Sequence, residues 1–156
     1  MTPKSTIMII VSTAVFMISC TSQTDENPIL NQFENLESGL DTTYLPFEMY
    51  FEGRDFDIMV YVEEDSLFNI YEPIFAKHGY SGNGYSWEGL IEQIIKKLDP
   101  ELLNHIMFDS EAGAFFAIAD SREIQIRFGK LLQPIFSDLS ILEKYLQEAD
   151  RSKIFD

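Results

Sequence analysis

The chain contains a single cysteine, Cys20, so it can form no intramolecular disulfide and its fold must be stabilised by packing alone. Hydrophobic residues make up 46% of the sequence and aromatic residues 13%, which is enough to build a core. A disordered acidic tail would lack these aromatic residues. We therefore expect one folded domain rather than a disulfide scaffold or a flexible chain.

Cys20 also ends an apolar run that resembles a secretory leader. The run, residues 7–18, follows the basic Lys4 and is shorter than the roughly 20 apolar residues that a membrane span needs. Met17-Ile18-Ser19-Cys20 resembles a bacterial lipobox, in which the cysteine is lipidated, for example with palmitate, and becomes the first mature residue. The motif departs from the usual pattern at Met17, where leucine is common. A plain signal peptide with a chance cysteine is the alternative.

Composition divides the chain into three parts. Residues 1–19 are predicted to be a lipoprotein signal peptide, residues 20–43 an acidic flexible tether, and residues 44–156 the folded domain. A polar, acidic stem is suited to holding a lipid-anchored domain clear of a membrane surface. These features predict a protein anchored in the cell envelope, facing the periplasm or the cell surface.

The charge of the chain is strongly negative. It has 11 basic and 26 acidic residues, a formal net charge of −15, and residues 20–65 hold 12 acidic residues against one basic residue, Arg54. Nucleic acid is disfavoured as a ligand because its recognition requires basic groups against phosphate. Two interpretations stay open: a solvated, self-repelling surface, or a surface that attracts a basic partner.

Two apolar runs around a glycine-containing turn predict a β-hairpin. Residues 47–51 form the first run and residues 56–62 the second, with Gly53 between them. Alternation in the second run gives one apolar face, Phe56, Ile58, Val60 and Val62. The opposite face, with Asp57, Met59 and Tyr61, is mixed.

Helical spacing of apolar residues predicts four helices after the hairpin. They are expected near residues 67–75, 87–98, 121–135 and 139–148. Pro73 could divide the first helix, and Pro134 could end or kink the third. Ser86 is the expected cap of the second helix. Local alternation at residues 124–128 also allows a strand. Short strands are expected at residues 106–108 and 114–119. The order of elements predicts a single α+β domain of antiparallel strands with packed amphipathic helices.

Residues that could support catalysis or bind a metal are few. His78 and His105 lie in no zinc-binding pattern, and no Gly-x-Ser-x-Gly elbow is present. We therefore expect no enzyme activity, metal, cofactor or small-molecule substrate. Asp109 and Glu111 lie two residues apart and could form a carboxylate pair, but a solvated turn is the simpler interpretation.

Residues of two kinds are candidates for contact with a protein partner. Tyr80, Tyr85 and Trp87, with Asn83, lie in or beside a glycine-rich loop, and tyrosine and tryptophan often anchor interfaces. The acidic candidates are Glu63, Glu64, Asp65, Asp109 and Glu111. The alternatives are that the aromatic residues pack into the core and that the acidic residues are merely solvated.

Two segments resemble the Imm51 family of bacterial immunity proteins: residues 79–90, GYSGNGYSWEGL, and residues 108–116, FDSEAGAFF. The first string is the more unusual. The resemblance covers about residues 46–146 and implies a protein of a polymorphic toxin system that neutralises its cognate toxin by binding. It carries over no catalytic residue. The lipoprotein-like leader is a departure, because protection against a cytoplasmic toxin would not need it.

These observations support two hypotheses. The first is a lipid-anchored immunity protein that occludes a cognate toxin at the envelope, where the acidic charge would suit a basic toxin. The second is an envelope lipoprotein with a structural role or with a carboxylate-based hydrolase activity on glycans, in which Asp109 and Glu111 would converge on a concave pocket.

Overall fold

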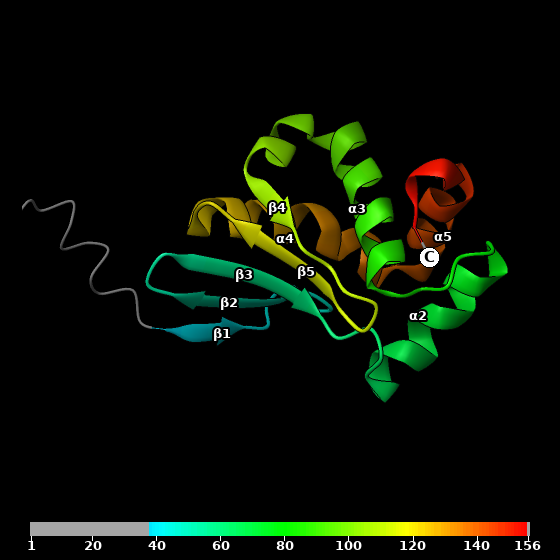
Figure 1. The fold of residues 1–156 in the computed structure, drawn as a ribbon, viewed down its shortest axis with the longest axis horizontal. Helices are drawn as coiled ribbons and strands as arrows, with labels where there is room; N and C mark the ends of the chain where they lie inside the picture. Colours follow the sequence, from blue (N-terminus) through cyan, green and yellow to red (C-terminus); the bar gives the residue numbers. More distant parts are fainter. Residues whose placement is uncertain (1–37, 156) are drawn as a thin grey trace, which may run out of the picture.

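Five antiparallel strands form one sheet in the order β1-β2-β3-β5-β4 (Figure 1). The computed structural model describes residues 38–155, so the leader, Cys20 and most of the predicted tether lie outside the described residues. The strands are β1 Gly39–Asp41, β2 Glu48–Glu52, β3 Asp55–Val60, β4 Ile106–Phe108 and β5 Phe115–Ala119. The helices are α2 Asp65–Lys77, α3 Gly84–Leu98, α4 Arg122–Ser137 and α5 Leu139–Glu148, with short 3-10 helices at Pro100–Asn104 and Arg151–Lys153. The α+β prediction is confirmed.

The predicted hairpin is formed by β2 and β3. Gly53 adopts a positive φ of 60° in its turn, a conformation that glycine reaches without steric strain. Phe56, Ile58 and Val60 are buried on one face of β3, as their alternation predicts. The sheet also begins earlier than residue 44: β1 pairs with β2 in the register Leu40 to Tyr50. Residues 39–41 of the predicted tether therefore belong to the sheet, where they form an edge strand.

Helices α3 and α4 cover one face of the sheet and enclose an aromatic core. Phe47 lies at its centre, with ring centroids 5.3 Å from Phe128 and 5.1 Å from Phe136, both in edge-to-face contact. Trp87 of α3 lies 4.8 Å from Phe136. Rings in these orientations add stabilisation beyond the area they bury. Helices α2 and α5 lie beyond one end of the sheet and close that end of the core (Figure 1).

Neither proline divides its helix. Helix α2 continues through Pro73, and α4 continues through Pro134 to Ser137. A proline removes one backbone hydrogen bond and would weaken an isolated helix. Here the residues on both sides are held by tertiary contacts: the Tyr71 hydroxyl donates to the Phe136 carbonyl at 3.0 Å, and Phe136 itself is buried. Burial of the Tyr71 side chain raises the pKa of its hydroxyl to about 12. The hydroxyl therefore stays protonated and can donate this hydrogen bond.

Helix α3 begins three residues before the predicted start. Its cap is Asn83 rather than Ser86, because the Asn83 Oδ1 accepts a hydrogen bond from the Ser86 amide at 2.8 Å. Leu98, the last residue of the predicted helix, is exposed, whereas its apolar residues Leu90, Ile91, Ile94 and Ile95 are buried. In α4 the helix is formed and the strand alternative is wrong. Ser121 is its cap, as predicted.

Candidate partner-binding surface

The structure separates the aromatic candidates by burial. Trp87 is fully buried and stacks on Phe75 with ring centroids 5.8 Å apart, while Tyr80 is buried beneath the Arg151 guanidinium. Only Tyr85 is exposed. Asn83 has a negative φ and serves as the α3 cap. Three of these four residues therefore have evident roles in the fold, and Tyr85 alone is available to a partner.

The two strings that carry the family resemblance meet in space. The Gly84 amide donates to the Ala112 carbonyl at 3.0 Å, and the Ser110 amide donates to Glu88 Oε2 at 3.2 Å. A Cβ on Gly84 would lie 2.0 Å from the Glu111 carbonyl oxygen, so only glycine permits this approach. The glycine-rich string thus joins the start of α3 to the turn between β4 and β5.

The acidic candidates gather at the same end of the sheet. All five are exposed, and they belong to the segments that follow β3 and precede β5. Val60, the last residue of β3, pairs with Phe115, the first residue of β5. The segment after β3 and the segment before β5 therefore leave the sheet at the same end. The Glu63 carboxylate reaches the turn, where its Oε2 would be 3.2 Å from a Cβ on Gly113. The structure therefore brings Glu63 to the turn that carries Asp109 and Glu111.

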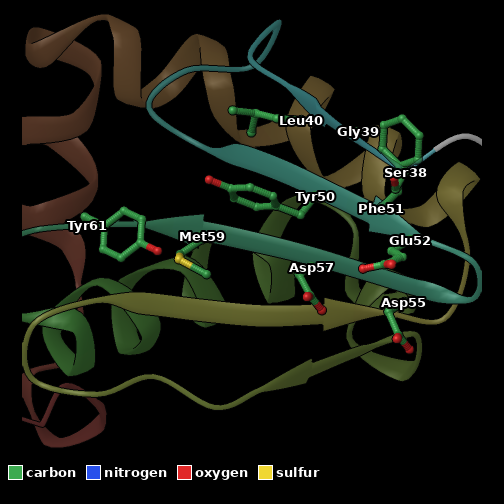
Figure 2. A pocket seen from close by; sticks show the side chains of 10 residues that line it. All are labelled: Ser38, Gly39, Leu40, Tyr50, Phe51, Glu52, Asp55, Asp57, Met59 and Tyr61. Carbon is green, nitrogen blue, oxygen red and sulfur yellow. The ribbon is translucent and has the colours of Figure 1, made fainter.

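A second surface was not identified by sequence reasoning: the sheet face opposite α3 and α4 (Figure 2). We call it the open face, because within residues 38–155 no helix packs on it. Its side chains alternate with the core-facing ones along the strands. They are Leu40, Glu48, Tyr50, Glu52, Asp55, Asp57, Met59, Tyr61, Met107, Phe116 and Ile118. The only local signal was the mixed composition of Asp57, Met59 and Tyr61.

The open face is hollowed between β1, β2 and β3. The hollow has a volume of about 530 Å³, and Figure 2 shows Tyr50 and Tyr61 on its apolar side and Asp55 and Asp57 on its acidic side. Glu52 adds a third carboxylate, and none of the ten lining residues is basic. This combination of aromatic and carboxylate groups is suited to a partner that offers both apolar and cationic atoms.

Neighbouring groups perturb two titratable side chains of the open face. Partial burial, reinforced by the nearby Asp55 carboxylate, raises the pKa of Asp57. The Tyr50 hydroxyl donates to Glu48 Oε2 at 2.9 Å, and this bond raises the pKa of Tyr50. Because Asp57 is harder to ionise in the folded state, its charge opposes folding at neutral pH, and this opposition fades as the pH falls through its raised pKa.

A buried amide of α4 supports the open face from beneath. The Gln125 Nε2 donates to the backbone carbonyls of Tyr50, at 2.8 Å, and Asp57, at 2.6 Å. Gln125 is fully buried, so its contacts are shielded from water. It thereby fixes the backbone of two neighbouring strands at the residues whose side chains line the hollow.

Replacing Gln125 by methionine should lower the free energy of unfolding by about 1–3 kcal/mol. Methionine has a similar shape but cannot donate, so two buried carbonyl oxygens lose a partner. Urea denaturation measures the change. The exposed Gln147 of α5 gives a matched control, because Gln147→Met should shift stability by less than about 0.5 kcal/mol. Equal effects at both positions would contradict the supporting role.

The ion pairs of Arg127, Lys97 and Arg122 are formed with carboxylates that do not belong to the open face. Arg127 binds Asp99 through two hydrogen bonds of 2.7 Å, and Lys97 binds Glu148 at 2.7 Å. Arg122 pairs with Asp41 at the sheet edge. In the described part of the chain, no ion pair involves a carboxylate of the open face. These carboxylates are therefore available to cations from outside the domain.

The structure adds no support for a carboxylate-based hydrolase. Asp109 and Glu111 are exposed on a turn, and neither lines the hollow of the open face. His105 pairs with Asp120, and His78 lies 3.2 Å from Glu143. Among residues 38–155, no group of three metal-ligating side chains is close enough to hold an ion. No described helix has the length and apolar character to cross a membrane.

Comparison with known proteins identifies the family of the chain. A family model described as Immunity protein 51, Imm51, matches residues 47–151, well over half of the chain. The match runs from the residue before β2 to the last short helix and includes both strings that meet at Gly84. No curated protein and no solved structure matches the chain.

Proposed function

Because the chain belongs to the Imm51 family of immunity proteins, we propose that it binds a cognate bacterial toxin and neutralises it by occlusion rather than by catalysis. The family match over residues 47–151 is the observation that carries the proposal. The match spans β2 to β5 and helices α2 to α5, so the proposed function belongs to the folded domain as a whole.

The surface chemistry of the domain supports binding to a basic protein. The net charge of −15 attracts a positively charged partner over long range and accelerates its encounter. At short range, the exposed Tyr61 and Met107 share the open face with carboxylates that form no ion pair within residues 38–155. Interfaces are enriched in tyrosine and methionine, because these side chains bury large areas on binding. A basic toxin surface is the partner that fits both properties.

We further propose that the protein acts at the cell envelope. The support comes from the sequence: a basic start, an apolar run too short to span a membrane, and a lipobox-like string ending at Cys20. In this proposal Cys20 carries a lipid, and the following acidic residues separate the domain from the membrane surface. The toxin would then be met outside the cytoplasm.

Protection of living cells tests the proposed function. The protein is produced together with the toxin encoded by the adjacent gene, directed to the envelope. Survival should be restored by the wild-type protein, and the two proteins should co-purify. A lysine-rich protein without toxicity serves as the binding control. If the toxin binds no more tightly than that control, and the cells die, the proposal is wrong.

Replacing Cys20 by serine should abolish membrane anchoring without affecting toxin binding. The substitution removes the only thiol that can be lipidated. We expect the wild-type protein in the membrane fraction and labelled by palmitate, and the Cys20→Ser protein unlabelled and outside that fraction. Affinity measured with purified protein should stay within about twofold, because Cys20 precedes the residues 47–151 that the family model matches. Unchanged fractionation and protection would contradict the lipid anchor.

A further inference from the structure

We propose that the open face is the surface on which the toxin docks, and that the toxin presents a basic segment whose cationic side chain meets the Asp57 carboxylate. This inference rests on the proposed function and names the surface that performs it. In this inference the open face, rather than the glycine-rich loop, is the main contact site. Tyr80 and Trp87 of the loop region are buried in the core.

Strand register places Asp57 at the centre of the open face. Leu40, Tyr50, Asp57, Ile118 and Met107 pair in one continuous row across all five strands. Within this row the carboxylate therefore lies among apolar and aromatic side chains, and the Asp55 carboxylate is its charged neighbour along β3. Binding energy in protein interfaces concentrates at such central positions, where the surrounding contacts exclude water.

Several apolar side chains of this row and of neighbouring positions on the open face are exposed to solvent. Met107 is 59% exposed, Leu40 50% and Tyr61 47%. Met59 and Phe116 form the adjacent row and are half-buried by these neighbours. Contiguous exposed apolar groups on one face mark a site of interaction. A toxin segment lying over them would bury this area.

The charges of the open face determine the kind of partner. Asp57 and Asp55 repel one another, and within residues 38–155 neither has an ion pair. A lysine or arginine from a partner would relieve this repulsion and supply the missing counter-charge. Glu48 and Glu52 extend the negative charge along β2. The same charges argue against a second copy of this chain, which would bring two acidic faces together.

The chain's own N-terminal segment is also a poor occupant by charge. Residues 20–37 contain four acidic residues and no basic residue, so their contact with Asp55 and Asp57 would be repulsive. The hollow of about 530 Å³ is open to solvent and falls within the usual range of binding clefts. A protruding basic loop or strand of the toxin fits these properties best.

Affinity measurements with paired variants test the inference. The probe is the toxin encoded by the adjacent gene, titrated against full-length protein in mild detergent. Tyr61→Ala should weaken the affinity by at least about 30-fold, the loss typical of an interface hot spot. Its control is Phe68→Ala on α2, because Phe68 is 46% exposed and Tyr61 is 47% exposed. This control should change the affinity by less than about twofold.

Asp57→Asn tests the charge and separates binding from folding. We expect the affinity to fall by about tenfold or more, because the amide keeps the shape and removes the charge. The stability of the free protein should not fall, since the neutral amide relieves the repulsion from Asp55. The control is Glu92→Gln, at an exposed position of α3, which should leave the affinity nearly unchanged.

The outcomes distinguish the two proposals. Losses at Tyr61 and Asp57 with unchanged controls support the open face. If the wild-type protein binds and protects but these variants bind equally well, the open face is wrong and the proposed function survives. If the wild-type protein neither binds nor protects, both fail. If the free protein dimerises and Tyr61→Ala abolishes the dimer, the face belongs to a second copy and the inference is overturned.

Discussion

Gly84→Ala is expected to lower the free energy of unfolding by at least about 3 kcal/mol, or to prevent folding. The new Cβ would lie 2.0 Å from the Glu111 carbonyl oxygen and 2.1 Å from that of Ala114. Both are backbone atoms, so no side chain can rotate away. Helix α3 would have to move from the β4–β5 turn, and the hydrogen bond from the Gly84 amide to Ala112 would break.

Urea denaturation, followed by the fluorescence of the single tryptophan, measures this loss. Gly53→Ala is the matched control. Gly53 has a positive φ of 60° but nothing within 4 Å of the new Cβ, so only backbone strain of about 1–2 kcal/mol is expected. If Gly84→Ala were no more destabilising than Gly53→Ala, the close approach would not be important for stability.

Trp87→Ala is expected to destabilise the domain by about 3–5 kcal/mol. The indole is fully buried and lies 4.8 Å from Phe136 and 4.8 Å from Tyr71, so its removal leaves a cavity in the aromatic core. Circular dichroism is the suitable probe, because the variant has no tryptophan. A stable variant with weakened toxin binding would instead make Trp87 a contact residue, as one sequence interpretation proposed.

Trp87→Phe provides a second measure of the same site. A phenyl ring keeps part of the stacking but leaves a smaller cavity. The substitution also removes the indole Nε1, which is buried without a hydrogen-bond partner in the described structure. Since an unpaired buried donor costs about 1–3 kcal/mol, its removal offsets part of the cavity term. We expect Trp87→Phe to be clearly less destabilising than Trp87→Ala.

Periodicity predicted the elements of the domain better than their ends. The β2–β3 hairpin and helices α3, α4 and α5 follow from local spacing of apolar residues, which depends on neighbours in the sequence. The start of α3 was misplaced because Asn83 and Ser86 are both good caps, and local sequence does not rank them. Pro73 and Pro134 were overestimated as breakers, because burial of neighbouring residues compensates for the lost hydrogen bonds.

The candidate surface was less predictable, because it is assembled from separated segments. Sequence alternation identified Asp57, Met59 and Tyr61 as one mixed face. It could not show that Leu40, Met107 and Ile118 join them, since that depends on strand order and register. Similarly, no local signal placed Glu63 beside the β4–β5 turn. The pairing of β3 with β5, which are separated by more than 50 residues of chain, brings Glu63 to that turn.

The sequence by itself determined the absence of a disulfide, the acidic charge, the α+β class and the strings that resemble Imm51. Each of these is a local or summed property of the residues. Tertiary structure decided which aromatic residues form the core and which sheet face remains open. Trp87 and Tyr85 are two residues apart, yet one is buried and the other exposed. The burial of a side chain depends on the elements packed against it, and those elements come from distant parts of the chain.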